Sequence, residues 1–372
     1  MKKRYWLISM LTLVLLAAFL LPACAEPEPE PAPAPAPKPA PAPAPKPAPV
    51  EPIVLKLAPG GIMIPEALFG AIPWWANEVE TRSEGRIKLE VYFGETLAKG
   101  RENIDALESG LADVIFPAPH HSPGKLPLYT IGNVPGLSDD YWAKSMAFYE
   151  LLMTDQALLD EFAGYGGMPL GVAYYPPTAL ISTSPLRSLD DVKGLQFAAR
   201  YPASDLLAAF DGVPVSLAPP EEYEALMRGT VDGIACPVAA VLDFGFHEVA
   251  KYYTRFNLGD RMHALIISKS VFDKLTPQDQ QMLLDLAPEY TQEAYDCCAI
   301  GLEPRGLDTM IDFGVEIFVP SEADAAALIA AAEVMEVAWV DDMNSQGLPG
   351  TELMNRYKEL IPKYEAESPY KK

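Results

Sequence analysis

The sequence is poor in cysteine, histidine and basic residues. Its 372 residues include 4 cysteines and 4 histidines, and 28 lysines and arginines stand against 51 aspartates and glutamates, a formal charge of −23. This excess of negative charge argues against nucleic acid and anionic lipid as partners. A local positive site could still bind an anion, because charges in solution are largely screened beyond roughly 8 Å.

The cysteines and histidines form no recognisable metal or disulfide framework. No CxxC spacing occurs, and the adjacent Cys297 and Cys298 fit small buried side chains. His120 and His121 are adjacent, without HxH or HxxxH spacing. Metal binding, loop packing and ligand contact are all open interpretations of this pair, with loop packing favoured. We expect no bound metal and no cofactor.

Motifs of common catalytic sites are also missing. The chain has no GxSxG, HExxH, P-loop or GxGxxG sequence. A Ser-His-Asp triad has no local support. We therefore expect a protein that is not an enzyme, and a lipid-anchored hydrolase is the least favoured class.

The N-terminus has the pattern of a targeting segment. Basic residues at 2–4 precede an apolar run from Tyr5 to Leu21, and Leu21-Pro22-Ala23-Cys24 resembles the lipobox of bacterial lipoproteins. Residues 1–23 are predicted to be a lipoprotein signal peptide, with lipidation at Cys24. A plain signal peptide and a retained membrane anchor are the alternatives.

Residues 24–52 are rich in alternating proline and alanine. Such a segment cannot bury apolar surface and is typical of a stiff polyproline II tether. At about 3.1 Å per residue it could reach roughly 85 Å. We expect it to hold a soluble domain away from a membrane surface.

From Ile53 onward, short apolar strands alternate with helical patterns. Ile53–Leu57 and Arg86–Tyr92 have strand patterns, and 66–82 has a helical one. This alternation indicates an α/β architecture with mainly parallel sheets. The sequence pattern ExxxALxxGxxD occurs at 102–113 and again at 221–232, an internal echo within the chain. Both times it predicts a helix, a glycine that ends the helix, and a following strand. It suggests two similarly built lobes.

Two longer helices are predicted near the C-terminus. Thr276-Pro277 is a good start for a helix that runs to about Leu302. Ser321 with Asp324 resembles a capping box, and the alanine-rich helix that follows should end near Ser345.

Aromatic side chains lie near the ends of several predicted elements, where clefts between α/β lobes form. We take as candidate cleft residues Trp74, Tyr174, Tyr201 and Phe244. Core packing is the alternative for each. Tyr201 is the strongest candidate because it follows Arg200 at a strand end.

Several segments together resemble the solute-binding proteins of TRAP transporters. The central one, EEYEALMRGTVDG at 221–233, is similar to the family's ExYxALxxGxVDG sequence. Weaker matches are LDDVKGL at 189–195, HEVAKYYT at 247–254, YFGETL at 92–97 and FGVEI at 313–317. The resemblance covers residues from about 53 to 345.

The resemblance implies a two-lobed α/β fold of the type II periplasmic binding protein class. Mixed sheets would be flanked by helices, and a long helix, either 276–302 or the next one, would cross both lobes. The implied first lobe comprises about 53–176 and 262–305, the second about 177–261 and 306–345, and a helical tail 346–372. The chain would lie outside the cytoplasm, bind a small carboxylate between its lobes and deliver it to membrane permease subunits.

The carboxylate-binding arginine is where this chain departs from the family. The usual position, four residues after the glycine of GLKIR, holds Ala198, and Arg200 stands two residues later. Since strand faces alternate with period two, Arg200 could point the same way, roughly 6–7 Å along the strand. A bulge or a shifted loop could instead bring it back to the usual place. Arg200 could bind the ligand carboxylate, lie at the rim while aromatic and backbone groups hold the ligand, or pair with an internal acid.

The resemblance also suggests the remaining site residues and one further class of function. His120, Cys236 and the aromatic candidates above would line the ligand site with Arg200. The absence of arginine at Ala198 leaves a non-carboxylate or aromatic ligand as an alternative. The same fold could serve a ligand-sensing subunit, and neighbouring genes for two permease subunits would favour transport instead.

Overall fold

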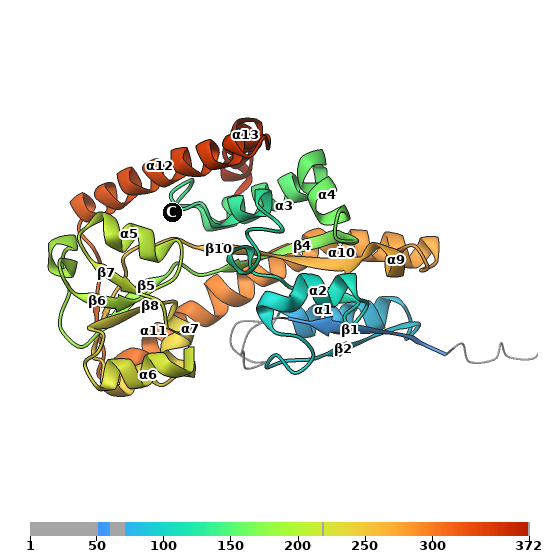
Figure 1. Ribbon diagram of the computed structural model, residues 1–372. Coiled ribbons are helices and arrows are strands. Elements are labelled where there is room, and N and C mark those ends of the chain that lie inside the picture. Colours follow the sequence, from blue (N-terminus) through green and yellow to red (C-terminus); the bar gives the residue numbers. More distant parts are fainter. Residues whose placement is uncertain (1–50, 60–70, 218, 371–372) are drawn as a thin grey trace, which may run out of the picture. The chain divides into compact units, whose positions relative to one another are not determined.

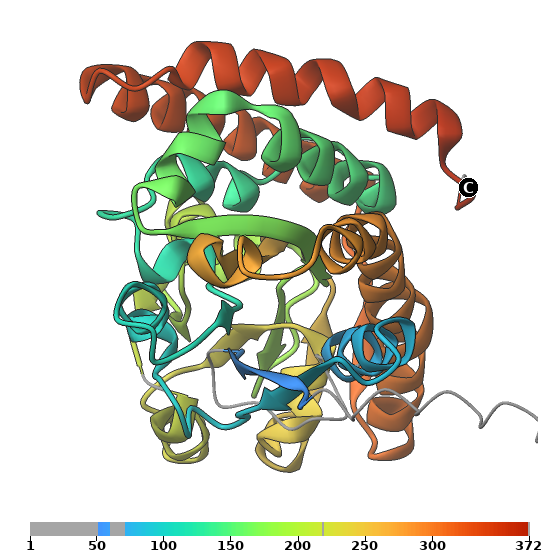
Figure 2. The same ribbon diagram turned by 90° about the vertical axis from the view of Figure 1, so that its right-hand side faces the viewer.

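Two mixed β-sheets flanked by helices form the framework of the protein (Figures 1 and 2). This computed structural model describes residues 51–59, 71–217 and 219–370. The predicted signal peptide, Cys24 and nearly all of the predicted tether lie outside the described residues, as do residues 66–70 of the first predicted helix. The chain from Val50 onward is one compact unit.

The first sheet, sheet A, has five strands in the order β2-β1-β3-β10-β4. Their bounds are β1 Ile53–Ala58, β2 Ile87–Val91, β3 Val114–Ile115, β4 Gly167–Tyr175 and β10 Arg261–Ser268. In β1 the side chains of Leu55 and Leu57 are buried while Lys56 between them is exposed, as period-two alternation requires. The predicted strands at 53–57 and 86–92 are therefore confirmed.

The second sheet, sheet B, has six strands in the order β11-β9-β5-β8-β6-β7. Their bounds are β5 Ala179–Ser182, β6 Gln196–Ala198, β7 Val213–Val215, β8 Gly233–Cys236, β9 Tyr252–Thr254 and β11 Glu316–Phe318. The two copies of the internal echo lie in different sheets, since β3 follows the first and β8 follows the second. In each copy the helix is followed by a glycine at positive φ, Gly110 at 72° and Gly229 at 69°.

Both sheets are mixed, as the resemblance implied: five of the nine strand pairings among the described residues are parallel, and the four antiparallel ones involve β5 and β10. Strand β10 runs antiparallel to both of its neighbours in sheet A, and β5 does the same in sheet B. The chain passes from β4 of sheet A to β5 of sheet B, and returns from β9 to β10. Simple alternation of helices and strands does not reveal these two crossings.

Helices cover both sheets and connect them. Their bounds are α1 Ala71–Arg82, α2 Asn103–Glu108, α3 Tyr141–Thr154, α4 Gln156–Ala163, α5 Ala203–Ala209, α6 Pro219–Met227, α7 Val238–Asp243, α8 Phe246–Val249, α9 Lys269–Phe272, α10 Pro277–Tyr295, α11 Glu303–Asp312, α12 Glu322–Ser345 and α13 Gly350–Glu367. Short 3₁₀ segments are η1 Gly100–Glu102, η2 Pro119–His121, η3 Leu128–Asn133 and η4 Leu189–Val192. Among the described residues, no helix is long and apolar enough to cross a membrane.

The helical segment that begins at Thr276 spans both sheets. Helix α10 packs on β4 of sheet A, a π-helical turn follows at Asp296–Leu302, and α11 packs against β11 of sheet B (Figure 1). Thr276 accepts a hydrogen bond from the N–H of Asp279, and Ser321 and Asp324 form a capping box at the start of α12. Both predicted helix starts are confirmed.

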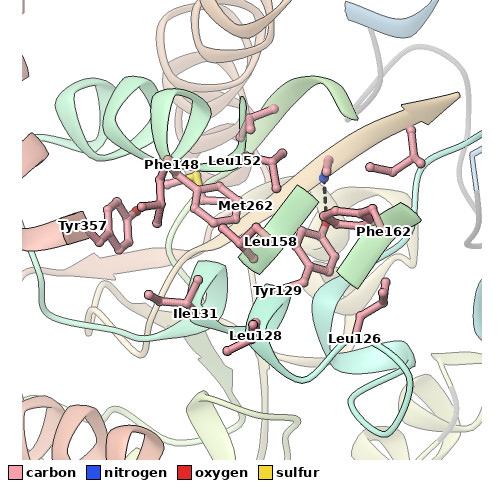
Figure 3. Close-up of a cluster of buried hydrophobic side chains, with 14 of the residues drawn as sticks. Leu126, Leu128, Tyr129, Ile131, Phe148, Leu152, Leu158, Phe162, Met262 and Tyr357 are labelled. Carbon is pink, nitrogen blue, oxygen red and sulfur yellow. Dashed lines mark hydrogen bonds between the residues drawn. The ribbon is translucent and has the colours of Figure 1, made fainter. Parts of the chain in front are cut away.

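The segment after β3 is fixed by a buried tyrosine (Figure 3). Tyr129 of η3 packs against Phe162 of α4, with ring centroids 5.1 Å apart. Its hydroxyl donates to the carbonyl of Pro117 at 2.8 Å and accepts from the N–H of Ala264 in β10 at 2.6 Å. Glu161 accepts from the N–H groups of Leu128 and Tyr129 at the start of η3, at 2.7 and 2.9 Å. These bonds hold η3 against sheet A.

A buried ion pair joins α3 to the loop that leads into β10. The Lys144 ammonium lies 2.8 Å from Asp260 and also donates to the carbonyl of Val134 at 3.0 Å. The Lys144 side chain is fully buried. Removing one partner of such a pair leaves an uncompensated buried charge, which costs about 3–5 kcal/mol.

We predict that Lys144→Met lowers the free energy of unfolding by about 3–5 kcal/mol, because Asp260 is then buried without a counter-ion. The double variant Lys144→Met/Asp260→Asn should lose less, since no lone charge is left. Urea denaturation of the single and double variants measures both effects. A single variant as stable as the parent chain would contradict this prediction.

Candidate functional site

Arg200 follows β6, at the start of the turn that leads into α5. Strand β6 ends at Ala198, whose side chain is fully buried in the sheet B core. Arg200 lies two residues beyond the end of β6, so strand alternation alone does not determine which way its side chain points. The direction of its side chain is set by the contacts of its guanidinium instead.

The Arg200 guanidinium is held by an internal acid. Its Nη2 lies 2.5 Å from Oε1 of Glu222 in α6 and donates to the carbonyl of Leu217 at 2.9 Å. The Glu222 side chain is 4% exposed and that of Arg200 is 34% exposed. Burial raises the pKa of Glu222, and the positive charge of Arg200 partly offsets this rise. Of the three interpretations of Arg200, this contact corresponds to pairing with an internal acid. Ligand contact by the same side chain stays a prediction.

A second arginine, Arg261, begins β10 and acts on the same groups. Its positive charge lowers the pKa of Glu222, in addition to the effect of Arg200. Burial raises the pKa of Cys236 at the end of β8 well above the usual value, Glu222 adds to that rise, and the two arginines oppose it. Arg200 and Glu222 are in direct contact, and Arg261 and Cys236 interact with them electrostatically. We call these four residues the charged cluster.

His120 of η2 borders the charged cluster. Burial lowers the pKa of this imidazole well below its usual range, so the ring is neutral at pH 7. The groups that lower it further are Arg261, His121, His263 and Arg200. The rings of His120 and His121 lie 4.5 Å apart, edge to face. In the described part of the chain, no group of three or more His, Cys, Asp or Glu side chains could hold a metal ion.

His120 also lines a cavity of about 380 Å³. One wall is the segment from His120 to Asn133, and the others are the start of α5 and the second half of α12. The remaining lining residues are Pro123, Pro127, Thr130, Tyr201, Asp205, Met335, Ala338, Trp339, Asp342, Met343 and Gln346. Burial raises the pKa of Tyr201 to about 12, and the charge of Asp205 adds to this. The Tyr201 phenol is thus protonated at neutral pH and can donate a hydrogen bond.

Asn133, at the end of η3, is the unusual member of the cavity lining. Its side chain is fully buried, yet neither its amide nitrogen nor its amide oxygen has a hydrogen-bond partner among the described residues. Nδ1 of His120 is likewise buried without a partner there. Leaving a buried polar group unsatisfied costs about 1–3 kcal/mol. Unpaired groups of this kind in a cavity wall are suited to meet a polar ligand.

The structure separates the sequence-predicted site residues into two sets. Arg200, Tyr201, His120 and Cys236 belong to the charged cluster or to the adjoining cavity. Of the other three aromatic candidates, Tyr174 is buried in a core, whereas Trp74 and Phe244 are half-buried against core residues. Ligand contact by these three side chains stays a prediction. Trp74 packs on the sheet A core, Tyr174 lies between the rings of Tyr141 and Tyr295, and Phe244 stacks on Phe246 with centroids 5.6 Å apart.

Four residues of this region were missed by reasoning from sequence: Glu222, Arg261, His263 and Asn133. Glu222 stands at the unspecified position of the ExYxAL motif, next to the specified Glu221. Arg261 and His263 open an apolar strand, where charge or polarity is unexpected, and Asn133 ends the apolar segment LYTIGN. For Arg261, His263 and Asn133, a polar residue in an otherwise apolar segment was the sequence signal that could have identified them.

We predict that Asn133→Leu raises the free energy of unfolding by about 1 kcal/mol or more, because it removes the unsatisfied amide while keeping its size. Asn257→Leu is the matched control. That amide donates to the Tyr141 hydroxyl at 2.8 Å and accepts from the N–H of Gly259, so its loss should destabilise the chain. Guanidinium denaturation of both variants tests the prediction, and equal destabilisation by the two would contradict it.

Comparison with known proteins gives the family. The model of the bacterial extracellular solute-binding protein family 7, DctP, matches residues 66–339. A solute-binding protein of Verminephrobacter eiseniae is 29% identical over 220 residues, which are 58% of this chain and 65% of that protein. The C4-dicarboxylate-binding periplasmic protein DctP of Rhodobacter capsulatus is 27% identical over 287 residues, 74% of this chain and 83% of its own.

Solved structures show the same fold. A TRAP periplasmic solute binding protein from Desulfovibrio salexigens superposes with a TM-score of 0.74 at 25% identity, covering 86% of this chain and 98% of that one. A TRAP solute binding protein from Rhodoferax ferrireducens, in complex with benzoate, gives a TM-score of 0.74 at 23% identity, covering 85% and 99%. The predicted two-sheet α/β fold is confirmed.

Coverage of the curated relatives is partial. This chain matches 65% of the length of the Verminephrobacter protein and 66% of that of a solute-binding protein from Albidiferax ferrireducens. The family model, in contrast, covers most of this chain and both of its sheets. The chain therefore belongs to family 7 of the bacterial extracellular solute-binding proteins, the DctP family.

Proposed function

We propose that this chain is the extracytoplasmic solute-binding subunit of a TRAP-type transporter, which captures a small organic acid and delivers it to membrane permease subunits. One observation carries the proposal. Arg200 follows β6 of sheet B, Arg261 begins β10 of sheet A, and both act on the buried Glu222 and Cys236. Arg200 contacts Glu222 directly, and Arg261 of the other sheet adds its positive charge to the electrostatics of Glu222 and Cys236.

A carboxylate is the ligand group that best suits this place. The planar guanidinium presents donors that match the two oxygens of a carboxylate, and hydrogen bonds to charged groups contribute about 1.5–3 kcal/mol each. In a chain of charge −23, the Arg200 guanidinium is a local cation that could contact an anionic ligand. Movement of the two sheets toward each other would exclude water and strengthen these contacts.

The ligands of related proteins support an organic acid. The Rhodobacter capsulatus relative is named for C4-dicarboxylates. Related solved structures contain benzoate, mandelate or pyroglutamate. We propose that this chain also binds a small organic acid, without assigning one particular acid to it. The alternative of a non-carboxylate ligand would leave the two arginines without a role in binding.

The proposal also concerns where the chain is located and how its solute-binding domain is divided into two lobes. Lipidation at Cys24 would anchor the chain outside the cytoplasm, and the proline-rich tether would let the domain reach the permease. Lobe boundaries near 176–177, 261–262 and 305–306 are supported by the three passages of the chain between sheets, from β4 to β5, from β9 to β10 and from β10 to β11. Genes for two permease subunits beside this one would support transport, and a receptor kinase gene there would support the sensing alternative.

We predict that Arg200→Ala weakens the binding of a carboxylate ligand at least tenfold, because it removes one of the two cations. A thermal-shift screen of aliphatic and aromatic mono- and dicarboxylates identifies the ligand, since a ligand that binds only the folded state raises Tm with its concentration. Calorimetry on the parent chain and the variant then gives the affinities.

Arg228→Ala is the matched control for this measurement. Arg228 is also an arginine paired with a glutamate, Glu224, but its side chain is 68% exposed at the end of α6. Its removal should leave the affinity within about twofold, because surface ion pairs contribute little. Unchanged affinity in Arg200→Ala would remove Arg200 from the site.

A further inference from the structure

The cavity lined by His120 is built from three segments that are distant in the sequence. Residues 120–133 follow β3 of sheet A, α5 follows β6 of sheet B, and α12 packs against α5 (Figure 1). Helix α12 and its C-cap contribute residues 335, 338, 339, 342, 343 and 346. This spacing places them on one face of the helix. The volume of about 380 Å³ lies within the range of small-molecule pockets, about 300–1,000 Å³.

The described residues that line this cavity carry negative charge and no positive charge. Asp205 and Asp342 belong to the lining, and no lysine or arginine is among its described members. Burial lowers the pKa of His120 well below its usual range, so this ring adds no charge at pH 7. Arg200 and Arg261 lower that pKa further, but neither is among the described lining residues. The lining therefore disfavours an anion and favours a cation.

Each of the two aspartates keeps one carboxylate oxygen for a ligand. Oδ1 of Asp205 accepts from the Ser204 hydroxyl at 2.8 Å, and Oδ2 of Asp342 accepts from the Gln346 amide at 3.1 Å. The other oxygen of each carboxylate accepts no hydrogen bond from the described residues. Both residues are exposed, so solvent weakens their attraction for a cation. Other surfaces of the cavity must add to the binding.

Two aromatic rings and two methionines supply such surfaces. Tyr201 and Trp339 line the cavity together with Met335 and Met343. Nε1 of Trp339 donates to the Thr130 hydroxyl at 2.8 Å, which fixes the indole ring. The face of an aromatic ring attracts a cation within about 6 Å, and thioethers pack easily around irregular ligands. Aromatic rings beside carboxylates suit an organic ammonium ion.

Asn133 gives a second and independent indication of a ligand. Its side chain is fully buried, and neither polar atom of its amide has a hydrogen-bond partner among the described residues. Nδ1 of His120 is likewise buried without a partner there, and both residues line the cavity. Such groups are rare in folded proteins. The amide oxygen can accept from an N–H or O–H donor, as can Nδ1 of the neutral ring when Nε2 carries its proton.

We propose that this cavity binds an organic ammonium ion. Its positive charge faces Asp205 and Asp342, and its hydrocarbon part lies against Tyr201 and Trp339. A donor group of the same ligand pairs with the Asn133 amide. The site goes beyond the proposed function and does not rest on it, because the charged cluster supplies none of these contacts.

The test compares cations with neutral compounds of nearly the same shape. Choline and 3,3-dimethylbutan-1-ol form one pair, in which carbon replaces the charged nitrogen, and benzylammonium and benzyl alcohol form the other. At pH 7.5 the parent chain should bind the cation of at least one pair with a Kd of about 1 mM or tighter. It should bind that cation about tenfold or more tightly than the neutral partner. Calorimetry at fixed ionic strength measures all four affinities.

The double variant Asp205→Asn/Asp342→Asn should bind that cation at least about tenfold more weakly and the neutral partner within about twofold of the parent chain. Asp341→Asn is the matched control, because Asp341 is an exposed neighbour of Asp342 on α12 but is not among the lining residues. It should leave both affinities within about twofold. A parent chain that binds neither cation, or a double variant that binds the cation unchanged, overturns the inference.

The variant Asn133→Leu separates a role in binding from a role in folding. This variant is predicted above to be more stable than the parent chain, and it should bind the cation at least about tenfold more weakly. Weaker binding by a more stable chain cannot result from unfolding. An affinity within about twofold of the parent's would overturn the role of Asn133.

The ammonium group belongs either to a separate molecule or to the organic acid itself, and two probes distinguish these sources. Choline and 4-(trimethylammonio)butyrate carry the same ammonium group, but the second also has a carboxylate. If both bind alike in the parent chain and in Arg200→Ala, the cation is a separate ligand. If the zwitterion binds at least about tenfold more tightly and Arg200→Ala removes that advantage, both charges belong to one ligand. Either result supports the cation site, and a chain that binds choline but no carboxylate contradicts only the proposed function.

Discussion

The antiparallel pairing of β4 with β10 is the constraint on which the rest of the structure depends. The two strands pair from Arg261 opposite Tyr175 to Ser268 opposite Gly167. They are also the strands at which the chain leaves sheet A and returns to it, so their ends determine where sheet B can lie. Arg261 lies in the terminal pair of this ladder, at the end where the chain passes between the two sheets. The position of the second cation follows directly from strand register.

The surrounding interactions stabilise that arrangement. Lys144 and Asp260 form a buried ion pair one residue before β10 begins, and the Tyr129 hydroxyl accepts from the backbone of Ala264 inside the strand. These contacts fix β10 against α3 and η3, and η3 carries Asn133 into the cavity wall. A polar, partly unsatisfied site is thus supported by a well-packed apolar core, which offsets its cost.

Sequence reasoning found the fold because local patterns carry it. Neighbouring residues determine each of these local features: the helix starts at Thr276 and Ser321, the helix-ending glycines Gly110 and Gly229, and the strand alternation at 53–57. The antiparallel direction of β5 and β10 was missed because it depends on the path between the two sheets. Periodicity within a segment contains no information on that path.

The candidate site was found only in part for the same reason. Arg200 and His120 were visible as rare residue types in an acidic, histidine-poor chain. Trp74, Tyr174 and Phe244 were chosen by aromatic character; Tyr174 is buried in a core, and the other two are half-buried against core residues. Glu222 was missed because its importance comes from its contact with Arg200, which lies 22 residues earlier in the sequence. Such a pairing can be recognised only after the contact is known.

The central proposal is that Arg200, held by the buried Glu222, and Arg261 of the other sheet contact the carboxylate of the ligand. A crystal structure of the chain with its bound carboxylate tests this most directly. The account predicts carboxylate oxygens within about 3 Å of guanidinium nitrogens of both Arg200 and Arg261, with Glu222 still bonded to Nη2 of Arg200. A carboxylate bound away from both arginines, or an Arg200 that leaves Glu222 to reach it, would contradict the account.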